Sequence, residues 1–255
     1  MKTLTFPQQD VYKGDLILVN ASHPIKEEPL SFELQQVHPD FPGISLRRRA
    51  AQMLTALLQS IDSRDRILPV SGYRTLYEQT VIFEECLREE GVGYTTGFVA
   101  QPNCSEHQTG LAIDLAEKRP DIDFICPDFP YTGICQRFRE NAVKYGFIER
   151  YQQGKESVTN IAAEPWHFRY VGCPHAQLIT EMNVTLEEYL NGLKQHRQDG
   201  SELRCLADGR NYEIFFLPVD DFVPVAVTLP ENVCCQVSGN NEDGLLVTLW
   251  KKSDR

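Results

Sequence analysis

The sequence predicts an α+β protein in which helices pack on a mainly antiparallel sheet, with a small β-rich module at the C-terminal end. Apolar residues recur at helical spacing over 45–61 and 186–196, which indicates amphipathic helices. Short β-prone runs lie beside polar motifs in the middle of the chain, and four more β-rich runs, separated by turn residues, fill 211–252. We therefore expect one domain over residues 1–197 and a β-rich module over residues 198–255.

The first half of the chain is expected to begin irregularly. Proline interrupts residues 1–44, which contain one strand-like run over 16–19. Ser45 is the expected N-cap of a helix that reaches about Ile61, because the apolar residues of this stretch share one helical face. A short strand over 68–74 then leads to a helix that begins with a capping box of Thr75 and Glu78 and ends near Gly91.

The second half alternates loops with short elements. Residues 92–104 and 117–134 are expected to be loops, because they are rich in turn residues and have little periodicity. A strand over 111–115 separates them, and a helix over 133–145 follows, closed by Gly146. We then expect a strand over 166–170, helices over 174–181 and 186–196, and strands over 212–219, 223–229, 233–237 and 245–250.

Composition excludes several classes of partner. The formal net charge is −11 and no cluster of Lys and Arg stands out, so binding to nucleic acid or to an anionic membrane is not expected. No segment has the apolar run of an export signal or a membrane span, which favours a cytoplasmic protein. The eight cysteines show no pairing pattern, so we expect free thiols in a reducing compartment.

Two polar stretches carry the chemistry. Residues 105–114 and 164–170 together supply two imidazoles, His107 and His167, and two carboxylates, Asp114 and Glu164. Catalytic zinc takes three His or carboxylate ligands and leaves its fourth position to water, and a nearby carboxylate then removes a proton from that water. This inventory predicts a zinc hydrolase with one Zn²⁺ per chain, held by His107, Asp114 and His167, with Glu164 as the base.

Local geometry supports this division of roles. Gly110 allows a tight turn, and on the following strand Asp114 can project towards His107 across that turn. Glu164 and His167 are three residues apart, so on a regular strand they would face opposite ways. Glu164 must therefore leave the regular strand to serve the same metal, and Pro165 makes this departure plausible.

These motifs resemble a known family. Ser-x-His-x-x-Gly-x-Ala-x-Asp over 105–114 and Glu-x-x-His over 164–167 are similar to the zinc D-alanyl-D-alanine peptidases of the VanX/VanY type. The similarity extends to Ser-Gly-Tyr-Arg over 71–74 and to His-Pro at 23–24, and the spacing of Arg74 and Gln79 ahead of His107 is most like that of the bifunctional VanXY enzymes. It covers about residues 10–197, and we do not expect it to cover the C-terminal module.

The resemblance implies a reaction and further roles. The substrates would be the D-alanyl-D-alanine dipeptide and muramyl pentapeptide precursors that end in it, and their destruction would give vancomycin resistance. Arg74 would meet the oxyanion, while Ser105 and Gln79 would contact the substrate. From the residues alone, Ser105 could equally cap the turn that presents His107, and Gln79 could be an ordinary helix residue.

Two alternatives remain open at the level of sequence. A peptidoglycan endopeptidase that cuts another bond would be expected to carry a wall-binding repeat or an export signal, and neither is evident. A non-catalytic zinc-binding interaction domain, as in hedgehog-type proteins of related architecture, would be favoured if the base were missing, but Glu164 is present. The C-terminal module shows no chemistry; packing against the catalytic domain and homodimer contact are both open for it.

Overall fold

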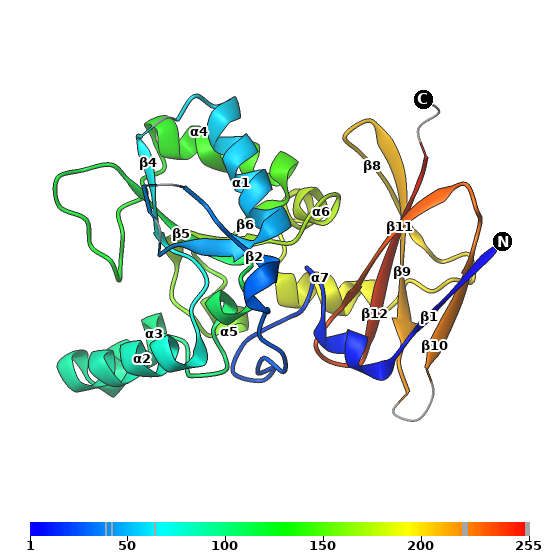
Figure 1. Cartoon of the computed structure of the whole chain (residues 1–255), viewed down its shortest axis with the longest axis horizontal. Coiled ribbons are helices and arrows are strands. Elements are labelled where there is room, and N and C mark those ends of the chain that lie inside the picture. Colours follow the sequence, from blue (N-terminus) through cyan, green and yellow to red (C-terminus); the bar gives the residue numbers. More distant parts are fainter. Residues whose placement is uncertain (39, 42, 64, 221–223, 253–255) are drawn as a thin grey trace. The chain divides into compact units, whose positions relative to one another are not determined.

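The structure is a computed structural model that describes residues 1–38, 40–41, 43–63, 65–220 and 224–252. The chain forms two compact units, one made of Val19–Thr185 and the other of Met1–Leu18 together with Leu186–Arg255 (Figure 1). The first of these, here called the central unit, contains all the residues that the sequence singles out for chemistry. The second is called the β unit.

The central unit is organised around a four-stranded antiparallel sheet of order β4-β5-β7-β6. Its strands are β4 (Ile67–Ser71), β5 (Ala112–Glu117), β7 (Glu164–Tyr170) and β6 (Phe147–Tyr151). Side chains alternate between the two faces of a strand, so β7 presents Phe168 and Tyr170 to one face and His167 and Arg169 to the other. The sheet thus has an apolar face and a face that carries polar groups.

Helices cover the apolar face. Phe168 is fully buried and its ring packs edge to face, at a centroid distance of 4.8 Å, against Phe138 of α4 (Gly133–Ala142). The helices α1 (Arg48–Ser60) and α6 (His175–Met182) lie on the same side of the sheet as α4 (Figure 1), and α4 continues into a 3₁₀ turn, η4 (Val143–Tyr145). Burial of these apolar surfaces fixes the sheet and so fixes the strands that carry the polar residues.

The remaining elements of the central unit lie around this core. The helices are α2 (Leu76–Glu90), α3 (Val92–Phe98) and α5 (Glu156–Thr159), with 3₁₀ turns η2 (Ser31–Glu33) and η3 (Glu106–Thr109). The short strands β2 (Leu34–Gln36) and β3 (Ser45–Arg47) pair antiparallel as a small hairpin. The side chain of Thr75 caps α2 by accepting a hydrogen bond from the backbone of Glu78, which confirms the predicted capping box.

Several predicted elements in the first part of the chain are wrong. Residues 16–19 form no strand but are buried in irregular backbone. Ser45 is not the N-cap of α1: it pairs in β3, and the helix begins three residues later at Arg48. Part of the predicted 92–104 loop is helical, as α3, and the edge strand β6 was not expected. Tertiary packing overrides weak local propensity at these places.

The β unit contains a second antiparallel sheet of order β11-β12-β9-β8. Its strands are β11 (Val233–Gly239), β12 (Gly244–Lys251), β9 (Arg210–Pro218) and β8 (Leu203–Ala207), and the unit also includes η1 (Gln8–Tyr12) and α7 (Leu186–Leu193). The four predicted β runs are confirmed in β9 to β12, except that residue 223 of the second run lies outside the described residues. The strand β8 was not predicted.

The N-terminus also belongs to the β unit. Strand β1 (Lys2–Phe6) pairs antiparallel with β10 (Val225–Leu229), and Leu4 and Phe6 pack on a buried cluster that includes Val227 and Leu229. The boundaries of the compact units therefore differ from the expected bounds of 1–197 and 198–255. The division into two functional domains at those expected bounds stays a prediction. In the described part of the chain, no helix is both long and apolar enough to cross a membrane.

Candidate active site

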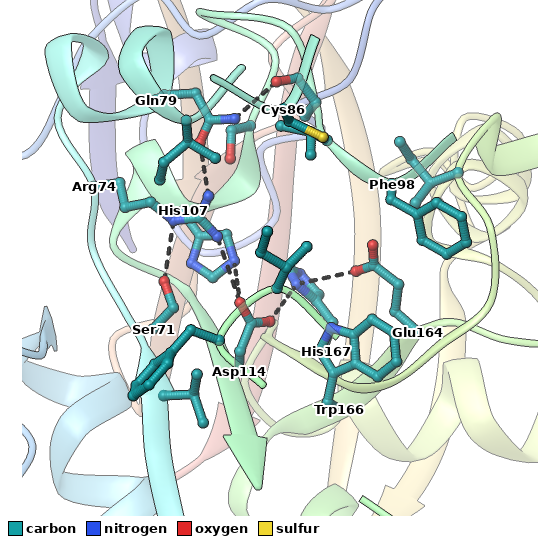
Figure 2. Close-up of a pocket in the computed structure, with 18 of the residues that line it drawn as sticks. Ser71, Arg74, Gln79, Cys86, Phe98, His107, Asp114, Glu164, Trp166 and His167 are labelled. Carbon is teal, nitrogen blue, oxygen red and sulfur yellow. Dashed lines mark hydrogen bonds and ion pairs between the residues drawn. The ribbon is translucent and has the colours of Figure 1, made fainter. Parts of the chain in front are cut away.

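The polar face of the central sheet borders a cavity of about 410 Å³. Figure 2 shows many of the side chains that line it. The lining residues come from all four strands of the sheet, from α2, α3 and η3, and from the intervening loops. All seven residues predicted for the site line this cavity: Arg74, Gln79, Ser105, His107, Asp114, Glu164 and His167. Segments that are far apart in the sequence are thus brought to one place by the antiparallel pairing of β4, β5 and β7.

His107 is presented by a tight 3₁₀ turn. The turn η3 ends at Gly110, whose backbone is left-handed with φ of 68°, a conformation that favours glycine. The Nδ1 atom of His107 lies 2.7 Å from the carbonyl oxygen of Gly72, and its Nε2 atom lies 3.0 Å from Oδ2 of Asp114. A backbone carbonyl can only accept, so Nδ1 carries the proton and the Nε2 lone pair faces the cavity.

Asp114 and His167 are direct partners across β5 and β7. Oδ1 of Asp114 lies 2.9 Å from Nδ1 of His167, while Oε2 of Glu164 lies 3.7 Å from the same nitrogen. The pairing of β6 with β7 shifts register near Tyr151, where that residue pairs with Glu164. This irregularity lets Glu164 and His167 approach each other although a regular strand would separate them, as the sequence led us to expect.

His107, Asp114 and His167 meet the chemical requirements of a metal site. Each is buried, and each offers a ligand atom within 4.8 Å of the other two. Burial lowers the pKa of His107 to about 4, which keeps this imidazole neutral, as a ligand must be. At His167 burial acts in the same direction, but Asp114, Glu106 and Glu164 outweigh it and raise the pKa to about 9. The surroundings of His167 therefore favour positive charge, which a metal cation would also supply.

Glu164 differs from Asp114 in its environment. Burial raises the pKa of Glu164 to about 8, and the nearby carboxylate of Asp114 acts in the same direction, although His167 opposes the shift. Asp114 is also buried, but its close contacts with the imidazoles of His107 and His167 hold its pKa below the usual range. One carboxylate is thus tied to both imidazoles, and the other faces the cavity beside them (Figure 2).

Arg74 is held in the cavity wall by three separate contacts. Nε donates to Oγ of Ser71 at 3.0 Å, Nη1 donates to Oε1 of Gln79 at 3.0 Å, and Nη2 lies 3.4 Å from Oδ2 of Asp114 (Figure 2). Gln79 is itself fixed, because its Nε2 donates to the carbonyl oxygen of Ala100 at 2.7 Å. Gln79 is therefore buried between Arg74 and the loop after α3, and is not an ordinary exposed helix residue.

Ser105 precedes η3 and is buried against the cavity. Within the described residues its side chain makes no capping hydrogen bond to that turn, so the alternative role as an N-cap of the turn finds no support. Thr109 ties the turn together in its place, since its hydroxyl donates to the carbonyl oxygen of Glu106 and accepts from the amide of Leu111.

Sequence reasoning missed a charged cluster beside the site. Oε1 of Glu106 accepts hydrogen bonds from Arg150 Nε and Arg169 Nη1, both at 2.8 Å, and its Oε2 lies 3.5 Å from Nε2 of His167. Burial opposes ionisation of Glu106, but the two guanidinium groups outweigh it and lower the pKa below the usual range. Arg169 is two residues after His167 on β7. Because side chains alternate between the faces of a strand, the sequence could have predicted that both lie on the same face. Arg150 lies on β6, which had no clear sequence signal.

A buried pair of histidines with an aspartate and a second carboxylate, set on an antiparallel sheet and open to a cavity, defines the class of metal-dependent hydrolases. The comparison with known families makes the class specific. The family model of VanY, D-alanyl-D-alanine carboxypeptidase, matches residues 43–173, and the chain belongs to this family.

Individual relatives agree with this assignment. The chain is 42% identical over 181 residues to the bifunctional D-Ala-D-Ala dipeptidase and D-Ala-D-Ala carboxypeptidase VanXYC of Enterococcus gallinarum, covering 71% of this chain and 95% of the relative. The crystal structure of the D,D-dipeptidase VanXYg with a D-Ala-D-Ala phosphinate analogue matches with a TM-score of 0.95 and 43% identity, covering 98% of this chain and 99% of that chain. A variant of the D,D-pentapeptidase VanY from a VanB-type cassette, in complex with Zn(II), matches with a TM-score of 0.58 and 32% identity, covering 69% and 99%.

The coverage corrects one expectation. We expected the family resemblance to end near residue 197, but the VanXYg structure matches almost the whole chain, the β unit included. The sequence signal was confined to the catalytic motifs because the β strands carry no functional residue types that could be recognised in isolation. The β unit is therefore shared with the D,D-dipeptidase VanXYg.

Proposed function

We propose that this protein is a zinc peptidase that hydrolyses the D-alanyl-D-alanine dipeptide and removes the terminal D-alanine from muramyl pentapeptide precursors. The observation that carries the proposal is the convergence of His107, Asp114 and His167 beside Glu164 in a single cavity. The activities that the relatives' names state give the substrate class. Removal of such termini would confer resistance to vancomycin.

One zinc ion per chain would be held by His107, Asp114 and His167. Zinc bound there would acidify a water molecule and polarise the scissile carbonyl. Glu164 would act as the general base: it would accept the proton of the attacking water and return it to the leaving amine. Its position 3.7 Å from His167, with its carboxylate turned to the cavity, supports this role.

Arg74 would stabilise the negative charge that develops on the carbonyl oxygen during the reaction. Its guanidinium is oriented in advance by Ser71 and Gln79, so little reorganisation is needed when the charge appears. Donors of this kind contribute on the order of 3 kcal/mol each in other hydrolases. Ser105 and Gln79, which line the same cavity, would contact the substrate.

We also propose that the enzyme acts in the cytoplasm, where the pentapeptide precursors would be accessible to it. The eight cysteines, all of them among the described residues, form no disulfide, and such cysteine usage is typical of proteins in a reducing compartment. Homodimer formation through the β unit remains a prediction, which the molar mass measured by light scattering would test.

The deciding experiment is an assay of the purified zinc-loaded protein on D-alanyl-D-alanine and on a pentapeptide that ends in it. We expect D-alanine release from at least one of the two, and loss of that release in the Glu164→Ala variant. Zinc binding without hydrolysis of either substrate would favour the non-catalytic interaction domain. Hydrolysis of other bonds in wall fragments would favour the endopeptidase.

A further inference from the structure

In each histidine of the site, one ring nitrogen faces Asp114 and the other contacts a different kind of group. Nδ1 of His107 contacts the carbonyl oxygen of Gly72 at 2.7 Å, so that Nε2 faces the cavity. His167 is turned the other way: its Nδ1 faces Asp114, and its Nε2 lies 3.5 Å from Oε2 of Glu106. The group behind His167 is therefore a carboxylate and not a backbone carbonyl.

The carboxylate of Glu106 is itself rigidly held. Its other oxygen, Oε1, accepts hydrogen bonds from both Arg150 and Arg169 at 2.8 Å. The side chains of the two arginines are 1% and 0% exposed, and that of Glu106 is 0% exposed. One oxygen of Glu106 is thus taken up by the guanidinium groups, and the second is directed at His167.

A contribution to stability is only a weak explanation for this cluster. Buried charges lose their hydration, and a buried Arg–Glu–Arg arrangement can often be replaced by apolar side chains with no loss of stability. Groups behind a metal-ligating histidine, in contrast, select which ring nitrogen carries the proton and raise the donor strength of the other nitrogen. The location of the cluster behind His167 fits the second role.

We propose that Glu106, clamped by Arg150 and Arg169, is a positioning residue for His167. It holds the proton of the imidazole on Nε2, so that the Nδ1 lone pair faces the metal position beside Asp114. Its negative charge also strengthens Nδ1 as a donor. The inference rests on the proposed zinc site, and it predicts that the cluster sets the zinc affinity.

The test compares zinc affinities of the metal-free wild type and two variants, measured by competition with a chromophoric chelator. Glu106→Gln keeps the shape of the side chain but removes its charge, and we expect zinc to bind about 10- to 100-fold more weakly. Glu149→Gln is the matched control. Glu149 forms a comparable, mostly buried pair with Arg139 at 2.7 Å, with side chains 13% and 9% exposed, and its other oxygen accepts a hydrogen bond from Tyr131.

Glu149→Gln should reduce the stability of the protein but leave its zinc affinity within about twofold of wild type. Cobalt substitution gives an independent readout: the visible absorption of bound Co²⁺ should shift in Glu106→Gln and not in Glu149→Gln, because only the first change reaches a ligand. If Glu106→Gln binds zinc as wild type does, or if both variants are weakened equally, the proposal is wrong.

Loss of the charge at Glu106 removes the carboxylate that neutralises two buried guanidinium groups, which can prevent folding. A triple variant, Glu106→Met with Arg150→Met and Arg169→Met, removes the three charges together and keeps an apolar interior. We expect it to fold and to bind zinc with the same 10- to 100-fold loss; unchanged affinity would contradict the positioning role. Failure of the wild type itself to bind zinc would instead refute the proposed function.

Discussion

Asp114 and His167 lie directly opposite each other on β5 and β7, with Oδ1 of Asp114 2.9 Å from Nδ1 of His167. The other carboxylate oxygen of Asp114 lies 3.0 Å from Nε2 of His107 and 3.4 Å from Nη2 of Arg74. A single aspartate on the central strand thus contacts both imidazoles and the guanidinium, so the strand pairing itself sets the spacing of the proposed metal ligands.

The first prediction concerns this ligand set. His107→Ala, Asp114→Ala and His167→Ala should each lose bound zinc, because two remaining ligands do not hold it tightly. The zinc content per chain, measured by mass spectrometry after dialysis, tests this, with wild type expected to hold one ion. A variant that keeps full occupancy would remove its residue from the set.

The second prediction concerns Glu164. If it is the base and not a ligand, Glu164→Ala should retain zinc and fold while kcat falls by about 100-fold or more. Zinc content and circular dichroism serve as controls in the same preparation. Activity within tenfold of wild type, or loss of the metal, would refute this assignment.

The third prediction concerns Arg74, whose three nitrogen atoms each contact a different side chain. The ammonium of a lysine cannot reproduce this planar arrangement, so Arg74→Lys should be impaired almost as strongly as Arg74→Ala. An interaction made only in the transition state should lower kcat with little change in KM.

A matched control for Arg74 is Arg49→Lys. Arg49 donates a hydrogen bond to the hydroxyl of Tyr170 and lies outside the proposed catalytic residues. This variant should keep wild-type kcat on D-alanyl-D-alanine. Normal kcat in both Arg74 variants would show that Arg74 is structural, whereas a raised KM would place it at the substrate carboxylate.

The fourth prediction concerns the pH dependence of stability and uses His175, which is 1% exposed at the start of α6. Burial lowers the pKa of His175 to about 3 from its ordinary 6.5. Between these values the unfolded chain binds a proton that the folded protein excludes, so the contribution is fully present above pH 6.5 and is lost as pH falls towards 3. At pH 5 the loss is on the order of 2 kcal/mol.

The measurement is the free energy of unfolding by urea at pH 8 and pH 5, in excess chelator so that metal release does not contribute. The decrease between the two pH values should be smaller in His175→Leu than in wild type by about 2 kcal/mol. Equal decreases in the two proteins would show that His175 does not exclude the proton in the folded state.

Features that depend on neighbouring residues could be predicted from the sequence. The capping box at Thr75 and Glu78, the helix closed by Gly146 and the strands around Asp114 and His167 follow from local propensity and periodicity, and the structure contains them. The residue types and spacing of the two polar stretches were likewise enough to propose the zinc ligands and the base.

Features that depend on pairing between distant segments could not be predicted from the sequence and became apparent in the folded chain. β1 joins the C-terminal β unit because Leu4 and Phe6 cover apolar residues more than 200 positions later, which no local pattern reveals. Glu106 looks like an ordinary residue of a polar motif until β6 and β7 bring Arg150 and Arg169 to it. A buried charge loses its hydration and must be compensated by a charged or hydrogen-bonding partner. The fold determines which residue becomes that partner.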